Sequence, residues 1–360
     1  MHRFVLLLTT TLVMLAFMSH SPSPKENAEG KLKDSRILKL EDLSFTDIDR
    51  LDRKKTIFLL TFGILEEHGP HLPVGSDYLM ATALRDGLIS RLHARHPDYN
   101  FVLFPVIPFG ECGANDLAGQ FEHVGTYDVR FRTLRDVTID LGASIARQKF
   151  QNIFIMHYHG CLLHNMAFND AARFVSQRYQ VRMVHLSGLV FAENDFWSAQ
   201  VIEKYLGKGW QERIGWEAHA GAAETSANLY LRKDLVKPEY KRLPPFFVKD
   251  PMEAILTTRK RPEWQGYWGD PAKASSQMGK DLMDDSIERA FRFAEKVLAG
   301  EDLSRLPLFP ENILSSPDAE TDVKDHLQLY SRQTSEVDAW LGKNGSERKM
   351  AEHQTAAKAQ

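Results

Sequence analysis

Five side chains that can bind a metal ion lie close together between residues 66 and 77. The segment FGILEEHGPHLPVGSDYLMA contains Glu66, Glu67, His68, His71 and Asp77. Two prolines and three glycines interrupt it, so we predict a loop rather than a helix. Mixed nitrogen and oxygen ligands suit Zn²⁺, Mn²⁺ or Fe²⁺, whereas an all-oxygen set would indicate Mg²⁺ or Ca²⁺. The segment therefore predicts a transition-metal site.

The spacing within this loop suggests which residues share a pocket. In an extended chain, residues two apart point the same way, so we expect Glu66 and His68 to face one pocket and Glu67 to face elsewhere. The rigid turn that follows brings Asp77 to the start of the next helix. His71 lies inside the turn, where histidines are usually solvated or structural, and we predict no metal-binding role for it.

Two further stretches place similar residues where other elements begin or end. In IFIMHYHGC, a buried strand runs directly into His157 and His159, which alternate with Tyr158 and therefore share a face. In WEAHAGAAETSANLYL, His219 and Glu224 lie together at the predicted start of a helix. Histidines and carboxylates at three such edges predict one shared site on one side of a sheet.

Apolar runs of strand length alternate with helical patterns along the chain. The predicted strands TIFLLTFG, FVLFPVIPFG, NIFIMHYHG and VRMVHLSGLV are separated by longer stretches such as LMATALRDGLISRLHARH. This alternation is typical of a parallel sheet, and strands that are apolar on both faces require a helical layer on each side. We therefore predict an α/β fold, a three-layer α/β/α sandwich with a mainly parallel central sheet. Ligands collect at the carboxyl ends of such strands, which is where the first loop lies.

The first residues indicate export. Residues 1–24 have a short basic start, an apolar run and a Ser/Pro-rich exit, as in a signal peptide. No clear cleavage site follows the run, so an uncleaved N-terminal anchor and a buried N-terminal helix stay open as alternatives. We predict a periplasmic or extracellular protein that contacts a membrane only through this segment, if at all.

The rest of the chain divides into three parts. We expect a charged linker over residues 25–39, a domain over residues 40–312 that begins with a short amphipathic helix, and a polar extension over residues 313–360 with room for one helix. Cys112 and Cys161 make no disulfide framework. We expect two buried thiols, which in an oxidising compartment could pair if the fold brings them together.

Composition argues against one class of partner. The chain has 360 residues and 43% hydrophobic content, enough to bury a substantial core. Its formal net charge is -3, and the basic residues are scattered rather than grouped. We therefore expect no nucleic-acid partner.

Three motifs resemble those of the creatininase, or creatinine amidohydrolase, family. The family's first motif is roughly G-x-x-E-Q-H-G-P-H-L-P-x-G-T-D, and GILEEHGPHLPVGSD is similar to it, with Glu67 in place of Gln and Ser in place of Thr. The second, N-G-H-G-G-N, is altered to HYHGCLLHN, which aligns with three inserted residues and places His159 and Asn165 on the family histidine and asparagine. The third, H-A-G-E-x-E-T-S, is HAGAAETS here, with Ala222 in place of one acid. The resemblance covers about residues 40–298.

The resemblance implies a binuclear metal centre. It places Glu66, His68, Asp77 and His159 on the family's metal ligands, with Asp77 where a carboxylate bridges two ions. Two divalent transition ions per chain, zinc, manganese or iron, would then share a hydroxide that attacks an amide carbonyl. Homo-oligomers are common in the family, so we expect a homo-oligomer by analogy.

The resemblance also bears on three residues around these ligands. His219 falls on a position that serves proton transfer in the family. Glu224 has two chemical roles open, ligand of the second ion or general base, with a plain helix cap as the alternative, and we favour ligation. Some members have a glutamate ligand two residues after the second motif's histidine, where this chain has Cys161. A thiolate can bind zinc, but we expect an inert thiol.

The predicted reaction is hydrolysis of a C–N bond in a small cyclic or linear amide, short peptides included. The family includes creatinine ring opening, formamide deformylation and peptide trimming, and the change at Cys161 argues against creatinine. Tyr158 and Trp216 are candidates to line the substrate pocket, with plain packing as their alternative role. The alternative function is a non-catalytic metal- or ligand-binding protein that keeps the same fold.

Overall fold

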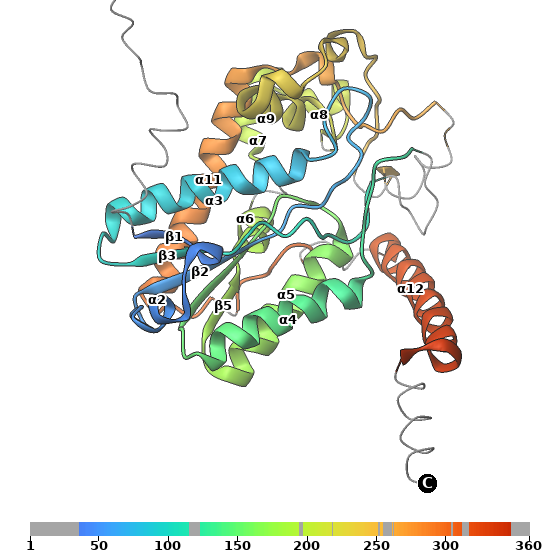
Figure 1. The fold of residues 1–360 in the computed structure, drawn as a ribbon. Helices are drawn as coiled ribbons and strands as arrows, with labels where there is room; N and C mark the ends of the chain where they lie inside the picture. Colours follow the sequence, from blue (N-terminus) through green and yellow to red (C-terminus); the bar gives the residue numbers. More distant parts are fainter. Residues whose placement is uncertain are drawn as a thin grey trace, which may run out of the picture. The chain divides into compact units, whose positions relative to one another are not determined.

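Five short strands form the central sheet of the protein in a computed structural model (Figure 1). It describes residues 36–346 except 115–122, 194–196, 218, 251–252, 255–260, 262, 304 and 312–316. The strands are β1 (Ile37–Lys39), β2 (Thr56–Thr61), β3 (Asn100–Leu103), β4 (Asn152–Met156) and β5 (Arg182–His185). Their order is β1-β3-β2-β4-β5, and every neighbouring pair is parallel. The predicted parallel sheet is confirmed, whereas the predicted leader lies outside the described residues.

Both faces of the sheet carry apolar side chains, as the continuous hydrophobicity of the strands requires. In β2, Ile57 and Leu59 belong to one cluster of buried side chains, whereas Phe58 and Leu60 belong to another. The residues of β4 alternate between the same two clusters. Each face of the sheet therefore has its own hydrophobic core.

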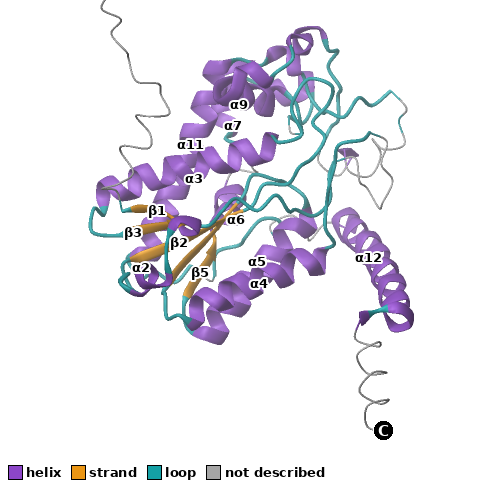
Figure 2. Cartoon of the chain, in the orientation of Figure 1, coloured by secondary structure: helices purple, strands orange, loops and turns teal. Residues whose placement is uncertain are grey.

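Helices cover both of these cores. α3 (Ser76–Arg95) and α11 (Ser276–Leu298) pack on one face, and α4 (Phe131–Arg147) and α5 (Leu162–Tyr179) pack on the other. Figure 1 and Figure 2 show the two pairs on opposite sides of the sheet. The predicted three-layer α/β/α sandwich is confirmed.

The other described helices are shorter, apart from one at the C-terminal end. They are η2 (Leu40–Asp42), α2 (Phe45–Asp49), α6 (Leu186–Glu193), α7 (Ala199–Leu206), α8 (Trp210–Ile214), α9 (Ala222–Arg232), η3 (Lys233–Leu235), η4 (Pro238–Arg242) and η6 (Pro271–Lys273). η2 and α2 occupy the region where the sequence predicts one amphipathic helix. A third, smaller apolar cluster packs the loops around α9 and contains Trp264, Tyr267 and Trp268.

The predicted linker ends earlier than expected. Residues 37–39 form β1, which pairs with Phe101, Val102 and Leu103 of β3. A strand of three residues is too short for hydrophobic periodicity to reveal it, so only the pairing with β3 defines it.

The C-terminal extension contains a long helix, α12 (Pro317–Asn344). Most of its described side chains are exposed, but His326 and Tyr330 are buried, at 2% and 6% exposure. No helix in the described part of the chain is both long and apolar enough to cross a membrane.

Candidate metal centre

The ends of two neighbouring strands bring most of the predicted ligands together. Glu66 and His68 follow β2, and His159 follows β4. Because β2 and β4 are adjacent and parallel, the loops after them leave the same edge of the sheet. Asp77 enters from the first turn of α3, and Glu224 enters from the first turn of α9.

The first group of possible ligands is Glu66, Asp77 and His159, whose ligand atoms all lie within 4.8 Å of one another. His159 Nδ1 lies 2.9 Å from Glu66 Oε2 and 3.1 Å from Asp77 Oδ2. The other oxygen of Glu66 accepts a hydrogen bond from the backbone N–H of Ala114 at 2.6 Å. That bond fixes the carboxylate so that Oε2 faces the histidine.

The second group is His68, Asp77 and Glu224, with the same limit of 4.8 Å between ligand atoms. His68 Nε2 lies 3.6 Å from Asp77 Oδ1 and 3.4 Å from Glu224 Oε2. Asp77 thus belongs to both groups, because Oδ1 faces His68 and Oδ2 faces His159.

Backbone carbonyls orient both histidines. His68 Nδ1–H donates to the carbonyl oxygen of Glu66 at 3.0 Å, which leaves Nε2 to face the carboxylates. In His159 the roles are reversed: Nε2–H donates to the carbonyl oxygen of Cys112 at 2.7 Å, and Nδ1 faces the carboxylates. A hydrogen bond from one ring nitrogen that leaves the other as a lone-pair donor is typical of histidines that bind metals.

Several buried polar atoms at this centre have no hydrogen-bond partner among the described residues. They are Glu66 Oε2, His68 Nε2, Asp77 Oδ2 and His219 Nε2. The 2.9 Å contact of Glu66 Oε2 with His159 satisfies the distance for an ion pair but not the geometry of a hydrogen bond. Buried polar atoms without partners are costly. Because these atoms converge, the residues fit a bound divalent cation.

The electrostatics of the centre lead to the same conclusion. Burial by itself would raise the pKa of Asp77, but the charges of His68 and His159 outweigh it and hold the pKa below its ordinary value. Burial would lower the pKa of His68, but Asp77 and Glu224 raise it to about 10. The buried carboxylates are therefore stabilised in their ionised form by positive charge beside them. A metal cation would supply that charge and let the imidazoles bind as neutral ligands.

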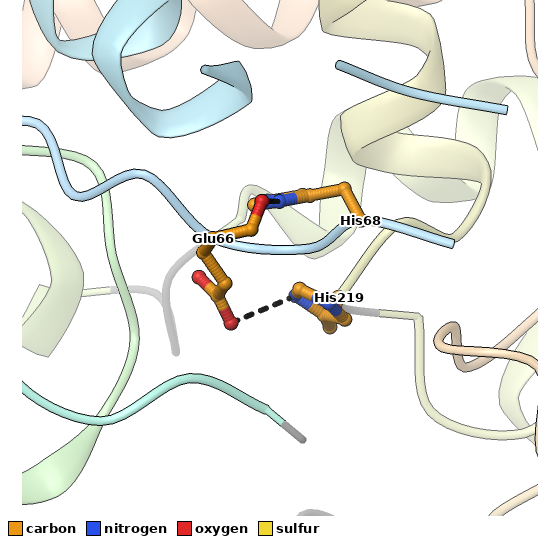
Figure 3. Close-up of side chains that lie close together, drawn as sticks. All are labelled: Glu66, His68 and His219. Atoms are coloured by element: carbon orange, nitrogen blue, oxygen red, sulfur yellow. Dashed lines mark hydrogen bonds and ion pairs between the residues drawn. The ribbon is translucent and has the colours of Figure 1, made fainter. Parts of the chain in front are cut away.

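His219 lies between two carboxylates, and with Glu66 and His68 it forms a third set of ligand-type side chains within 4.8 Å of one another. Figure 3 shows Glu66 and His68 on one segment and His219 on a second segment that approaches them. His219 Nδ1 lies 3.5 Å from Glu66 Oε1, and Nε2 lies 3.5 Å from Glu67 Oε1. The prediction that Glu67 faces elsewhere is wrong. Its Oε2 accepts a hydrogen bond from Gly69 N–H at 2.9 Å, which turns the side chain back toward His219.

Comparison with known proteins now identifies the family. The creatininase family, described as creatinine amidohydrolase, matches residues 41–294, which is most of the chain. The chain belongs to the creatininase family. The predicted resemblance to this family is thereby confirmed.

Individual creatininase-family relatives are distant in sequence. The mycofactocin precursor peptide peptidase of Mycobacterium ulcerans (strain Agy99) is 25% identical over 269 residues, which is 72% of this chain and 94% of the relative. A solved creatininase variant described as "Zn-Zn type" has a TM-score of 0.53 and 18% identity, over 73% of this chain and 98% of its own. A structure described as "Creatininase Mn" has a TM-score of 0.52 and 19% identity, over 72% and 98%. These two structures confirm the creatininase fold of the chain.

Of the two aromatic candidates for the substrate pocket, Tyr158 has its alternative role, plain packing in the core. Tyr158 does not line the centre: it is fully buried in the core, and its hydroxyl is hydrogen-bonded to Ser286 Oγ at 2.9 Å. Because side chains alternate along an extended chain, Tyr158 points away from the side on which His157 and His159 lie. Trp216 packs on Trp268, with ring centroids 5.5 Å apart, and Trp268 packs against His219 at 5.7 Å. Trp268 is therefore an aromatic side chain beside the centre, which sequence reasoning missed.

His71 has a structural position, as predicted. Its side chain is fully buried, and Nε2 is hydrogen-bonded to Thr225 Oγ1 of α9 at 2.8 Å. Burial, together with the nearby charge of His68, lowers the pKa of His71 to about 3. The neutral imidazole therefore joins the first loop to α9 at Thr225, the residue next to Glu224.

The remaining residues of the second motif support His159 from outside the two groups. Asn165 Nδ2–H donates to the carbonyl oxygen of His159 at 3.0 Å. His157 does not join the ligands, because its Nε2 pairs with His185 Nε2 at 2.7 Å. Cys161 belongs to neither group: its Sγ is in hydrogen-bond contact with Glu111 Oε2 at 3.3 Å. The expectation of two buried thiols holds for Cys112 but is wrong for Cys161, which is partly exposed, and the two form no disulfide.

Proposed function

We propose that this protein is a metal-dependent amidohydrolase that cleaves a C–N bond in a small cyclic or linear amide, short peptides included. The observation that carries the proposal is Asp77, whose two oxygens face two separate groups of ligand-type side chains. A carboxylate in this position can bridge two divalent ions. Membership of the creatininase family supports hydrolysis, and the manganese and zinc forms of related structures support a transition metal.

Each ion would have its own ligands. Glu66, Asp77 and His159 would hold one, and His68, Asp77 and Glu224 would hold the other. Such ions, when bound, polarise an amide carbonyl and lower the pKa of water to near neutrality. Hydrogen bonds to the backbone fix the orientation of the Glu66, His68 and His159 side chains and so keep their ligand atoms in place.

His219 is the residue that we assign to proton transfer. Hydrolysis adds a water oxygen to the carbonyl carbon and requires a proton on the departing nitrogen. Burial would lower the pKa of His219, but the charge of Glu66 and the contact with Glu67 outweigh it and raise the pKa. Its contacts with Glu66 and Glu67 hold the imidazole beside the ligand groups, where it could pass a proton to the leaving amine. Trp268, packed against the same ring, offers a flat surface to a planar amide.

Hydrolysis of a panel of amides tests this function. Metal-free protein is reconstituted with Zn²⁺ or Mn²⁺ and incubated with creatinine, N-formyl amides and short peptides, and the released amine is measured. We expect at least one compound to be cleaved, with activity lost on chelation and restored by metal. Asp77→Ala should abolish turnover, because both ions lose a ligand.

The control for this experiment is His96→Gln, a histidine substitution at the end of α3 where His96 contacts Glu295 of α11. It should keep both metal and turnover. If the wild-type protein carries two ions per chain and cleaves no compound of the panel, the non-catalytic alternative replaces the proposal.

A further inference from the structure

A second set of metal-binding side chains lies behind His159. While Nδ1 of His159 faces Asp77, Nε2 donates to the backbone of Cys112, where this second set begins. Donor atoms of Glu111, Cys112 and Cys161 all lie within 4.8 Å of one another. None of these three residues belongs to the groups around Asp77.

A fourth donor comes from α12. His326 Nε2 lies 3.7 Å from Cys112 Sγ, and Cys161 Sγ lies 3.3 Å from Glu111 Oε2. In a tetrahedral zinc site, sulfur lies about 2.3 Å and nitrogen or oxygen about 2.1 Å from the ion, so a sulfur lies about 3.6 Å from a neighbouring nitrogen or oxygen ligand. The two observed distances lie on either side of that value. His326 does not lie within 4.8 Å of all three other donors, so its side chain would have to move toward the ion to bind it.

The surroundings orient these donors and bury most of them. Tyr330 of α12 donates its hydroxyl hydrogen to Glu111 Oε1 at 2.8 Å, which leaves Oε2 to face the thiols. Glu111, Cys112 and His326 are each at most 3% exposed, whereas Cys161 is partly exposed. Structural zinc sites have four protein ligands, whereas catalytic sites keep one position for water. Glu111, Cys112 and Cys161 already lie together, and His326 beside Cys112 would complete the four.

The packing of α12 indicates what a metal site here would stabilise. The helix lies beyond residue 294, where the family match ends. His326 and Tyr330 are the buried side chains among those described in α12, while Leu327, Trp340 and Leu341 are at least 40% exposed. The apolar contact between this helix and the sandwich is therefore small, and the cluster lies where the two meet.

We propose that Glu111, Cys112, Cys161 and His326 bind a structural zinc ion, separate from the centre around Asp77, that holds α12 against the sandwich. Two sulfur ligands favour zinc over manganese or magnesium, which prefer oxygen. Binding would release the thiol protons to solvent and connect three segments that are far apart in the chain. This site goes beyond the proposed hydrolysis and does not depend on it.

The test uses the full chain, purified under reducing conditions and loaded with Co²⁺. A cobalt ion bound by thiolates absorbs in the near ultraviolet by sulfur-to-metal charge transfer, which oxygen and nitrogen ligands do not produce. We expect this band in the wild type and in Asp77→Ala, and its loss in Cys112→Ser and Cys161→Ser. With zinc, elemental analysis should give one ion fewer per chain in each serine variant than in the wild type.

Two further measurements do not depend on whether the serine variants fold. X-ray absorption of the zinc-loaded wild type should show sulfur neighbours at about 2.3 Å from zinc. Limited proteolysis should cut within α12 only after a chelator is added, in the wild type and in Asp77→Ala alike.

Three results would overturn the proposal. They are a wild type without the charge-transfer band and without sulfur neighbours, a band that persists when both cysteines are serine, and a metal-free disulfide between Cys112 and Cys161, revealed by the absence of reactive thiols in the denatured chain. Because Asp77→Ala removes the other centre and leaves this band, failure of the structural site and failure of the proposed hydrolysis give different results.

Discussion

Among single residues, Glu224 is the side chain whose role most distinguishes the possible mechanisms. Its Oε2 lies 3.4 Å from His68 and also accepts a hydrogen bond from Ala220 N–H at 2.7 Å. This position is compatible with three roles for Glu224: metal ligand, general base or helix cap. Since the second group would keep only His68 and Asp77 without it, we assign Glu224 to ligation.

Glu224→Gln tests this assignment, because an amide keeps the shape of the side chain but loses its charge and basicity. We expect the variant to lose roughly one of the two ions at the centre around Asp77, since a neutral amide oxygen is a weaker ligand. Elemental analysis after dialysis measures the loss. Glu203→Gln, an exposed position on α7, is the control and should keep both ions.

Other results would assign Glu224 differently. Full metal occupancy with turnover reduced by about two to four orders of magnitude would indicate a general base. Normal occupancy and normal turnover would leave only the cap role.

At the scale of elements, the contact between α9 and α11 holds Glu224 in position. A Cβ atom on Gly279 of α11 would overlap the carbonyl oxygen of Ser226 in α9 and lie 2.7 Å from Ala227 N. Backbone atoms cannot move away as a flexible side chain can, so the two helices approach this closely only because residue 279 is glycine. Ser226 lies two residues after Glu224.

Gly279→Ala should therefore destabilise the protein by about 1–3 kcal/mol through overpacking. It should also weaken metal binding, because α9 carries Glu224. Gly342→Ala is a matched control on α12, where an added Cβ meets no atom within 4 Å. There the higher helix propensity of alanine should stabilise the helix by about 0.5–1 kcal/mol. Chemical unfolding of both variants measures the difference, and equal stability of the two would contradict the role of Gly279.

At the scale of the whole molecule, the sequence predicts that the leader is separate from the folded domain. Export, a homo-oligomeric state and the role of the leader stay predictions. A chain that lacks residues 1–24 should be soluble, unfold cooperatively at the temperature of the full chain and bind the same amount of metal, because the leader serves export rather than the core. Calorimetry and elemental analysis measure both properties. Loss of cooperative unfolding would mean that the segment packs as a helix of the domain.

Local patterns in the sequence are enough to predict the fold class and the types of candidate ligand. Continuous apolar strands such as TIFLLTFG require burial on both faces, and the confirmed parallel sheet follows from that local property. Glu66, His68 and Asp77 were recognisable because they lie within one short loop. Their chemistry and spacing are local properties, which a single sequence records.

How these residues face one another depends on the packing of segments that are distant in the chain. Residue alternation sends Glu67 away from the pocket, yet the hydrogen bond to Gly69 returns it to His219. Trp268 reaches His219 from a distant loop, and His326 reaches Cys112 across 214 residues of chain. No local pattern contains such contacts, because they depend on how the loops and α12 pack after the sheet has formed.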